Sequence, residues 1–562
     1  MPVTASHRAP SVIAAALLLV ASVRVAGTYT VLNQTWDEPA HIATGLEWLQ
    51  RGSYTVEPLH PPLARVVSAL GPYLAGARLT PDEPNPWVQA NRILGAGPSY
   101  WRTLALARVA TLAFFLTAGA AVFLLTRKAI GPWPAAAAVL LFSTLPPVLA
   151  HAGLATTDLP LAAVVMVSLA AFVAWLERPD LRRSILLGAA IGAAVLTKFS
   201  ALLFLPVVFT VTAIAARWAG GQASLAGRRG APMYRLLRPV WLAGLVVIWA
   251  GYRFSVGPIV PTEGPRHCES STPCTVDSLP PLVARLVTAP VYPAPELIRG
   301  LVAYAREARL GRKGYLLGQR RWGGWWYFFP VALAIKTPLP FLLLGTVGAA
   351  ALVATHPRGP NWLALAAGAS ACGILFTLMP SRVNIGLRHA LAVYPLLSVV
   401  AAFGARTLWN WKRGVAGPVL LVALLGWQIG SSVRAAPDFV AYFNALAPGP
   451  PEHYLIDSDL DWGQDLARLA DTLDARGIRD VALAYNGSAD PRALGIPRYR
   501  GLRPFTGDTG WVAVSVFALE MGIWNQPTWD DYAWLRPLRP VARAGRSILL
   551  YRVDPESSDG KR

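Results

Sequence analysis

The sequence predicts a polytopic α-helical membrane protein of about eleven spans that carries a soluble α/β domain at its C-terminal end. Two observations predict this architecture. Hydrophobic residues make up 54% of the 562 residues and charged residues only 15%, which is more apolar than a soluble protein needs to fill its cores. Apolar runs of about 20 residues recur through the segment 1–433, whereas 434–562 alternates short strands with an amphipathic helix.

The apolar runs set the expected spans. They begin near residues 11, 103, 134, 159, 184, 201, 239, 337, 361, 390 and 417. The first run could instead be a cleaved signal peptide, because Arg8 precedes it and Arg24 interrupts it. In both cases the chain after residue 32 is expected on the outer side of the membrane.

The charge distribution gives the orientation. The chain has 51 Lys and Arg against 31 Asp and Glu, a net charge of +20. With the N-terminus inside, the cations of the inner loops are Arg127, Lys128, Arg178, Arg182, Arg183, Arg217, Arg228, Arg229, Arg235, Arg238, Arg358, Lys412 and Arg413. The short outer loops hold only Lys198, Arg382 and Arg388. Much of the excess is therefore a topology signal, and binding to nucleic acid is not needed to explain it.

Three long segments are expected outside: 33–102, 257–325 and 434–562. The aromatic cluster 322–329 predicts a membrane-interface belt, which places Lys336 at headgroup depth. Cys268 and Cys274 could form a small disulfide loop there. In the last segment we expect strands at YLID, VALAYNG, WVAVSVFAL and SILLYRV, and a helix from Asp461 to Gly477.

Acidic side chains on the outer side are the first candidates for chemistry. Asp37 and Glu38 form a carboxylate pair, of which one member could act as a general base toward a hydroxyl. Asp37 could equally cap the helix that follows it. Asp158 lies in a second outer loop, where it could line the same site or merely cap the next span.

Outer cations are the second group. Lys198, Lys336, Arg382, Arg388 and His389 suit a phosphate, since Arg offers a planar fork and Lys a point charge. Anchoring at the membrane surface by snorkelling is the alternative.

Two further outer segments have open interpretations. His60 and Arg65 flank a Pro-Pro turn that could present them to an anionic headgroup, or that could simply begin an interfacial helix. The acidic run 457–465 lacks the glycine and glutamate positions of an EF-hand, so a turn leading into a helix is favoured over a calcium site.

These features together resemble bacterial membrane glycosyltransferases of family 39, relatives of the protein O-mannosyltransferases and of the lipid A aminoarabinose transferase. The resemblance lies in the first-loop Asp-Glu pair and in HPPLAR, TTDLP, YLLGQRRWGGWWYFFPVALAIKTPLP, NIGLRHALAVYP and YFNALAPGPPEHYLIDSDLDWGQDL. It implies a GT-C fold with the active site on the outer face. It also implies transfer of a sugar from a polyprenyl-phosphate carrier to a hydroxyl, without a nucleotide sugar.

The resemblance assigns roles residue by residue. Asp37 matches the acidic residue proposed as catalytic base, Glu38 is its companion, and Asp158 matches a second acidic residue near the site. His60 and Arg65 match a His-Pro-Pro-Leu turn that often continues in relatives as Gly-Lys rather than Ala-Arg. The C-terminal α/β domain is unlike the lumenal domain of the mannosyltransferases, which argues against a protein acceptor.

The resemblance also implies partners and a location. The expected partners are a polyprenyl-phosphate-linked sugar, an acceptor glycan, lipid or protein, and membrane lipids, in a bacterial inner membrane with the C-terminal domain outside. No cofactor is certain, although a divalent metal could replace some of the cations. The alternatives are a polyprenyl-lipid transporter or flippase, expected to have inverted repeats, and a non-catalytic envelope assembly protein. The sequence specifies neither the donor sugar nor the acceptor.

Overall fold

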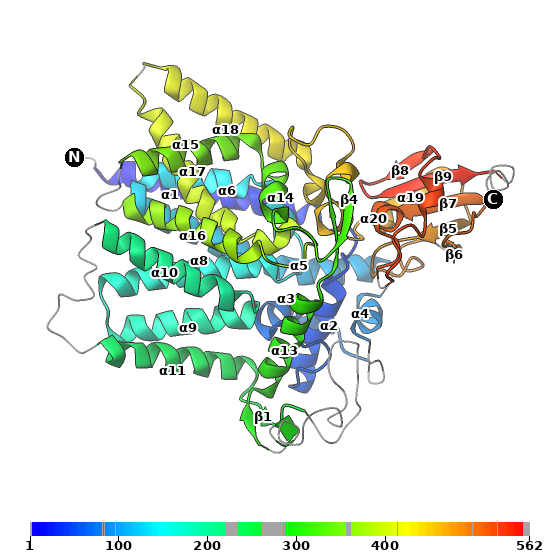
Figure 1. Cartoon of the computed structure of the whole chain (residues 1–562), viewed down its shortest axis with the longest axis horizontal. Helices are drawn as coiled ribbons and strands as arrows, with labels where there is room; N and C mark the ends of the chain where they lie inside the picture. The colour runs from blue at the N-terminus through cyan, green and yellow to red at the C-terminus, as the bar shows by residue number, and fades with distance from the viewer. Residues whose placement is uncertain are drawn as a thin grey trace.

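The structure is a computed structural model that describes residues 3–80, 83, 85–95, 97–219, 233–260, 285, 287–288, 290–355, 361–412, 414–496, 498–524 and 526–554. Cys268 and Cys274 lie outside the described residues. Long helices lie side by side, and a smaller α/β unit sits beyond one end of them (Figure 1). The short helices α2, α3, α4 and α13 gather at that same end.

The helices of the bundle are α1 Val3–Ala26, α5 Pro98–Ile130, α6 Pro132–Ser143, α7 Pro146–Ala152, α8 Asp158–Glu177, α9 Leu181–Thr197, α10 Ala201–Trp218, α11 Met233–Gly251, α14 Phe328–Lys336, α15 Leu339–Thr355, α16 Trp362–Leu378, α17 Val393–Trp409 and α18 Ala416–Ala435. Every expected span coincides with one of these helices or with a bent pair. Among the described residues, five helices are long and apolar enough to cross a membrane, or seven if each bent pair is one span. The count of eleven spans therefore stays a prediction.

Proline breaks two of the spans. The axes of α6 and α7 differ by 69°, and those of α14 and α15 by 116°. A residue before proline avoids helical torsion angles, and Leu145, which precedes Pro146, is extended. The expected restart of the chain at TPLP is confirmed, because α15 begins at Leu339 with Pro340 in its first turn.

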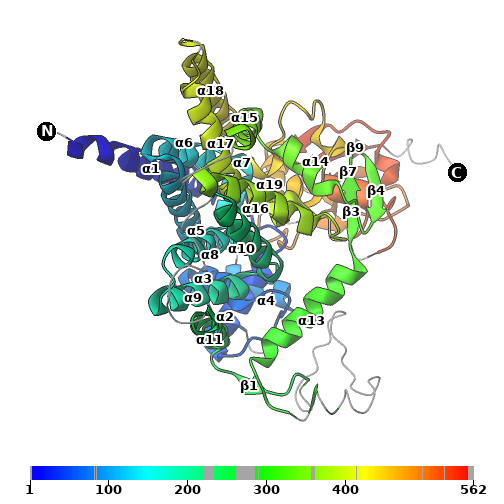
Figure 2. The same ribbon diagram turned by 60° about the vertical axis from the view of Figure 1, so that its left-hand side comes forward.

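Short elements lie between the long helices at the end nearest the α/β unit. They are α2 Glu38–Arg51, α3 Pro62–Leu74, α4 Pro86–Leu94, α13 Pro295–Leu310, and two hairpins that pair β1 Val256–Gly257 with β2 Tyr292–Pro293 and β3 Lys313–Leu316 with β4 Gln319–Trp322. Helix α2 ends at Gly52, whose φ of 71° suits glycine. Helix α13 runs between the two hairpins (Figure 2).

The α/β unit is built on a five-stranded sheet in the order β6-β5-β7-β9-β8. Its strands are β5 Val481–Ala484, β6 Tyr499–Gly501, β7 Gly510–Ser515, β8 Ala542–Ala544 and β9 Ile548–Val553, and its helices are α19 Leu466–Ala475 and α20 Val516–Met521. Strand β5 pairs in parallel with β6 and β7, whereas β9 runs antiparallel to β7 and β8. Two apolar clusters form the core of the unit.

Three local predictions in this unit are wrong. YLID is not a strand, because Asp457–Asp459 form a 3-10 turn, η6, in which Asp457 has a φ of 52°. Helix α19 begins at Leu466 rather than Asp461. The strand expected through Leu519 stops at Ser515, whose side chain accepts from the Ala518 amide and starts α20.

The domain boundary predicted at residue 434 remains a prediction. Residues that follow α18 still pack against the helix bundle before the sheet begins. Phe439, Leu455 and Trp462 pack in the hydrophobic core of the bundle, while the sheet begins only at Val481.

Candidate active site

An ion pair joins the first loop to the turn before α17. The Asp37 carboxylate accepts a hydrogen bond of 2.6 Å from Nη1 of Arg388. Arg388 belongs to the short 3-10 turn η3, Leu387–Ala390. Asp37 is at the N-cap position of α2, yet its side chain makes no capping hydrogen bond. Of the two sequence interpretations, the structure therefore favours the one in which Asp37 faces a site.

A second ion pair lies beside the first. Nζ of Lys198 is 2.5 Å from one oxygen of Asp158, and Nη1 of Arg388 is 3.7 Å from the other. Asp158 is the first residue of α8 and Lys198 follows the last residue of α9, so the ends of two helices bring them together. Thus Asp37, Asp158, Lys198 and Arg388, which the sequence marked in four separate loops, form one group that we call the Asp37 cluster.

Arg388 is the centre of the Asp37 cluster. Its guanidinium carbon lies 4.3 Å from the centroid of the Trp462 ring, a favourable cation–π geometry. Burial would lower the pKa of Arg388, but Asp37 and Asp158 outweigh it and raise that pKa above its ordinary value. Nε of Arg388 and Oδ2 of Asp158 are both buried without a hydrogen-bond partner. Each can therefore still pair with a polar group of a ligand.

Asp457 is a third carboxylate close to this group, and the sequence interpretation missed it. One of its oxygens accepts from the Ser458 amide at 2.6 Å, and the other is buried without a partner. Burial raises the pKa of the Asp457 carboxyl to about 8, although the charge of Arg388 opposes this shift. Its place in an acidic run was the available signal, which was interpreted only as a turn.

Glu38 faces away from its neighbour in the chain. Its two oxygens accept from Nε and Nη2 of Arg108 at 2.8 Å each, and both side chains are fully buried. The amides of Thr35 and Ala155 donate to the same carboxylate. All of these contacts fix the start of α2 and leave Glu38 no free oxygen, which favours a positioning role over a catalytic one.

The hydrogen-bonding groups of Arg65, like those of Glu38, are engaged by other residues of the chain. Its guanidinium pairs with Glu57 and donates to Nδ1 of His41 at 3.0 Å and to the Tyr54 hydroxyl at 3.1 Å. Only 1% of Arg65 is exposed. These contacts hold α2 against α3 and do not present the guanidinium to a headgroup.

His60 feels the charges of all four residues of the Asp37 cluster. Its ring centroid is 5.4 Å from that of His41, and its Nδ1 is buried without a partner. Burial, assisted by the charge of Lys198, lowers the pKa of His60 to about 4. His60 is therefore a neutral imidazole at pH 7.

The remaining candidate cations lie in different surroundings. Nζ of Lys336 donates to the carbonyls of Val440 at 2.6 Å and Asp459 at 2.5 Å, so it ties the α14–α15 bend to the C-terminal segment. Arg382 is exposed and donates to the Arg309 carbonyl. His389 stacks on Phe329, and burial together with Lys198 and Arg388 lowers its pKa well below the ordinary value. Neither Lys336 nor Arg382 makes a direct ion pair with the Asp37 cluster.

The described residues contain no group of three or more His, Cys, Asp and Glu side chains arranged to hold a metal ion. In the Asp37 cluster each carboxylate faces Arg388 or Lys198 instead. The two cations of the cluster, Lys198 and Arg388, are groups that can also pair with an anion.

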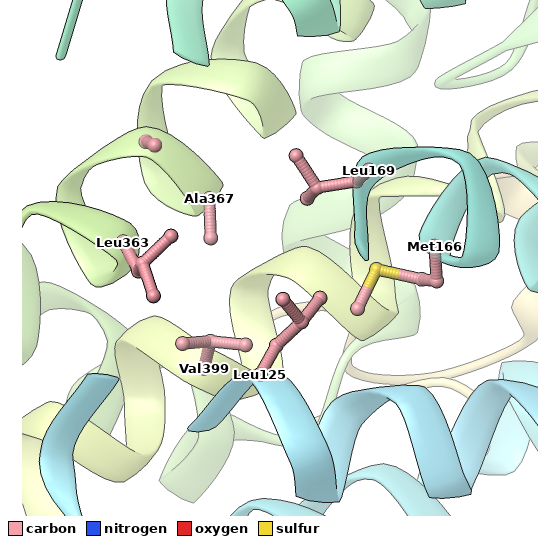
Figure 3. Close-up of a pocket in the computed structure, with 7 residues that line it drawn as sticks. Leu125, Met166, Leu169, Leu363, Ala367 and Val399 are labelled. Carbon is pink, nitrogen blue, oxygen red and sulfur yellow. The ribbon is translucent and has the colours of Figure 1, made fainter. Parts of the chain in front are cut away.

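A separate pocket is entirely apolar. It lies between α5, α8, α16 and α17 and is lined by Leu125, Met166, Leu169, Leu363, Ala366, Ala367 and Val399 (Figure 3). Since no charged or hydrogen-bonding side chain lines it, it is not the catalytic site.

Part of the chain matches a known sequence family. The sequence model of the dolichyl-phosphate-mannose-protein mannosyltransferase family matches residues 14–257, a region that contains Asp37, Asp158 and Lys198. No curated protein sequence matches the chain.

Solved structures show the fold. ArnT from Cupriavidus metallidurans bound to undecaprenyl phosphate is 16% identical with a TM-score of 0.50, over 95% of this chain and 97% of that chain. An oligosaccharyltransferase from Archaeoglobus fulgidus, tethered with an acceptor peptide, is 10% identical with a TM-score of 0.48, over 90% of this chain and 69% of that one. The fold argument rests on the first of these. The chain therefore has the GT-C fold of membrane glycosyltransferases, and residues 14–257 match the dolichyl-phosphate-mannose-protein mannosyltransferase family.

Proposed function

We propose that this protein is a glycosyltransferase that moves a sugar from a polyprenyl-phosphate carrier to an acceptor hydroxyl, with inversion at the anomeric carbon. The observation that carries the proposal is the pair of Asp37 and Arg388, a carboxylate that does not cap its helix and a buried guanidinium. The GT-C fold and the family match support the same reaction class.

Asp37 is the proposed general base. Its side chain is 23% exposed, whereas that of Asp158 is 2% exposed, so Asp37 is the carboxylate that an acceptor hydroxyl can reach. It takes the hydroxyl proton while the oxygen attacks the anomeric carbon. A positioned base of this kind typically contributes about 10²–10⁴-fold to the rate.

Arg388 and Lys198 are the proposed phosphate-binding groups. The bond that breaks joins the anomeric carbon to a phosphate oxygen, which leaves with the electron pair and gains negative charge. Two buried cations facing that oxygen stabilise this charge without a proton donor. Arg388 suits the task because its Nε is still unpaired and its fork matches phosphate oxygens.

Asp158 is the proposed positioning carboxylate. It holds Nζ of Lys198 at 2.5 Å and lies 3.7 Å from Arg388, so it fixes both cations. His60 and His389 flank the group as neutral side chains able to hydrogen-bond sugar hydroxyls, and burial is the main cause of the lowered pKa of each.

The proposed setting is the outer surface of a bacterial inner membrane, with the α/β unit outside. Asp37, Asp158, Lys198 and Arg388 all sit at helix starts or ends, and Arg388 lies against Trp462 of the segment that leads into the α/β unit. A transporter site is expected near the membrane midplane, so this placement favours an enzyme acting at the surface. The proposed acceptor is a hydroxyl of a glycan, lipid or protein.

The decisive experiment is transfer by the purified full-length protein in lipid nanodiscs. A panel of radiolabelled polyprenyl-phosphate sugars is offered with a membrane extract that contains acceptors, and product is followed by chromatography. We expect label to leave the carrier in the wild type and to stay on it in Asp37→Asn. Carrier turnover that is equal in both proteins would remove Asp37 as the base, and no turnover of any donor in the panel would contradict the reaction class.

A further inference from the structure

The segment 457–465 of the C-terminal region contacts the residues of the first loop that immediately precede Asp37, the proposed base. The Trp36 amide donates to the Trp462 carbonyl at 3.0 Å, and the Asn33 amide donates to the Gln464 carbonyl at 3.1 Å. The Asn33 side chain adds a bond of 2.8 Å to the Gly463 carbonyl. Since Trp36 precedes Asp37, these bonds fix the backbone that presents the carboxylate.

The same segment holds the turn that carries Arg388. The Asp459 carboxylate accepts from the Leu387 amide through both oxygens at 3.2 Å. Ser458 donates to the Ile385 carbonyl from its amide at 3.3 Å and also from its hydroxyl. The Trp462 ring lies against the guanidinium of Arg388 at 4.3 Å.

The segment is anchored in the α/β unit by Asp461 and Asp465. Asp461 accepts from the Phe517 amide at the start of α20 at 2.7 Å. Asp465 accepts from the amides of Arg546 and Ser547 at 2.8 and 3.0 Å, and from the Ser547 hydroxyl at 2.9 Å. Both carboxylates are fully buried. The acidic run therefore connects the sheet to the loops that carry Asp37 and Arg388.

Trp462 is the residue at which the two connections meet. Its carbonyl holds the Asp37 side of the ion pair and its ring holds the Arg388 side. Only 2% of Trp462 is exposed, and its ring also lies 5.9 Å from that of His151. A ring buried to this extent has little freedom to rotate, so its contact can hold the Arg388 guanidinium in one orientation.

We propose that the α/β unit is a working part of the active site and that Trp462 is its positioning residue, which holds Arg388 in the orientation that binds the carrier phosphate. This inference rests on the proposed function. A stacked ring restricts a guanidinium without using any of its N–H donors. Arg388 thus keeps Nε available while Asp37 holds Nη1.

A double-mutant cycle tests this role. Binding of undecaprenyl phosphate alone is measured for the full-length wild type, Trp462→Leu, Arg388→Ala and the double variant, together with turnover of a labelled donor. We expect Trp462→Leu to weaken binding about five- to tenfold and Arg388→Ala at least tenfold. The double variant should bind as weakly as Arg388→Ala, because Trp462 acts only through the guanidinium.

Two further variants keep the test sharp if Trp462→Leu proves unstable. Trp462→Phe keeps an aromatic face and should bind within about twofold of the wild type. Trp511→Leu removes a ring that lies 5.3 Å from the Arg552 guanidinium on the sheet, away from the site, and should leave binding unchanged.

The outcomes separate the two proposals. If the wild type binds the carrier and turns over donor, two results would overturn the role of Trp462 and leave the proposed function standing. The first is a double variant whose loss of binding is the product of the two single losses. The second is a Trp462→Phe variant that binds as weakly as Trp462→Leu. A wild type that neither binds undecaprenyl phosphate nor turns over any donor would contradict the proposed function, and this inference with it.

Discussion

Asp37 and Arg388 stand 351 positions apart in the chain, yet Nη1 of Arg388 donates a hydrogen bond of 2.6 Å to the Asp37 carboxylate. The proposed base and the proposed phosphate-binding cation therefore neutralise each other. On the proposed function, the carrier phosphate binds Nε of Arg388 while Nη1 stays on Asp37, so the two anions compete for the charge of one guanidinium and the Asp37 carboxylate becomes a better proton acceptor. Base activation is in this way linked to donor binding.

This competition predicts opposite effects of one substitution on two measurements. Asp37→Asn should lower sugar transfer about 10²–10⁴-fold, while undecaprenyl phosphate binds as tightly as to the wild type or a few-fold more tightly. The reason is that a neutral amide no longer competes for Arg388. Transfer is followed by label on the acceptor, and binding in a separate titration. Asp480→Asn, an exposed aspartate paired with Arg500, is the control, and a parallel loss of binding in Asp37→Asn would contradict the model of competition.

Glu38 should matter for stability more than for chemistry. Glu38→Gln leaves the buried charge of Arg108 without its partner, and breaking a buried ion pair in this way costs about 3–5 kcal/mol. The free energy of unfolding is measured by SDS titration in mixed micelles. The matched control is Glu83→Gln, because Glu83 pairs with an Arg92 side chain that is 51% exposed, where a loss below about 1 kcal/mol is expected. Equal losses in the two variants would be the contrary result.

Asp457 should make stability depend on pH. Burial raises the pKa of its carboxyl from 3.8 to about 8, so the folded state keeps a proton that the unfolded state loses above pH 4. Stability is then highest below the unfolded pKa and falls as pH rises to about 8. Asp457→Asn cannot titrate, so its advantage over the wild type should grow by roughly 2 kcal/mol between pH 5 and pH 7. The exposed control Asp490→Asn should show a difference that does not change with pH, and a similarly constant difference for Asp457→Asn would refute the assignment.

The contact of α2 with α3 should be sensitive to one methyl group. A Cβ at Gly45 would overlap the Arg65 carbonyl and the Ala69 side chain. Gly45→Ala should therefore cost about 1–3 kcal/mol of unfolding free energy and lower transfer, because α2 carries Asp37 at its start. Gly426→Ala is the control, since no atom lies within 4 Å of the added Cβ, and it should be neutral or stabilising by up to ~1 kcal/mol. Equal changes in unfolding free energy for the two substitutions would show that the close contact of α2 with α3 at Gly45 does not contribute to stability.

The positions of the long helices were predictable because an apolar run of about 20 residues reports a helix directly. The short strands β6 and β8 were not, since they have three residues each and their pairing comes from the sheet. The break after Leu145 was missed, because the run was taken as one span although Pro146 interrupts it.

The candidate site was predictable in part for a related reason. Residue type and outer location selected Asp37, Asp158, Lys198 and Arg388, which the structure brings together. The sequence could not separate Asp37 from Glu38, because adjacent side chains diverge and the partner of Glu38 is Arg108, inside an apolar run.

Two of the candidate cations show the same limit. Arg65 and Lys336 look like phosphate ligands in sequence, but Glu57 and two backbone carbonyls already engage them. Trp462 carries no charge, so a search among ionisable residues passes over it.

The pairing of Asn33 and Trp36 with 462–464 has a consequence for biosynthesis. The last helix of the bundle ends at Ala435, so the ribosome has delivered every membrane helix before it makes the residues that fix the first loop. We expect chains arrested just after α18 to be inserted but silent in the donor-turnover assay. Chains released past the α/β unit should become active without any further insertion. On the proposed function, the protein therefore gains activity only after the residues that pair with its first loop have been made.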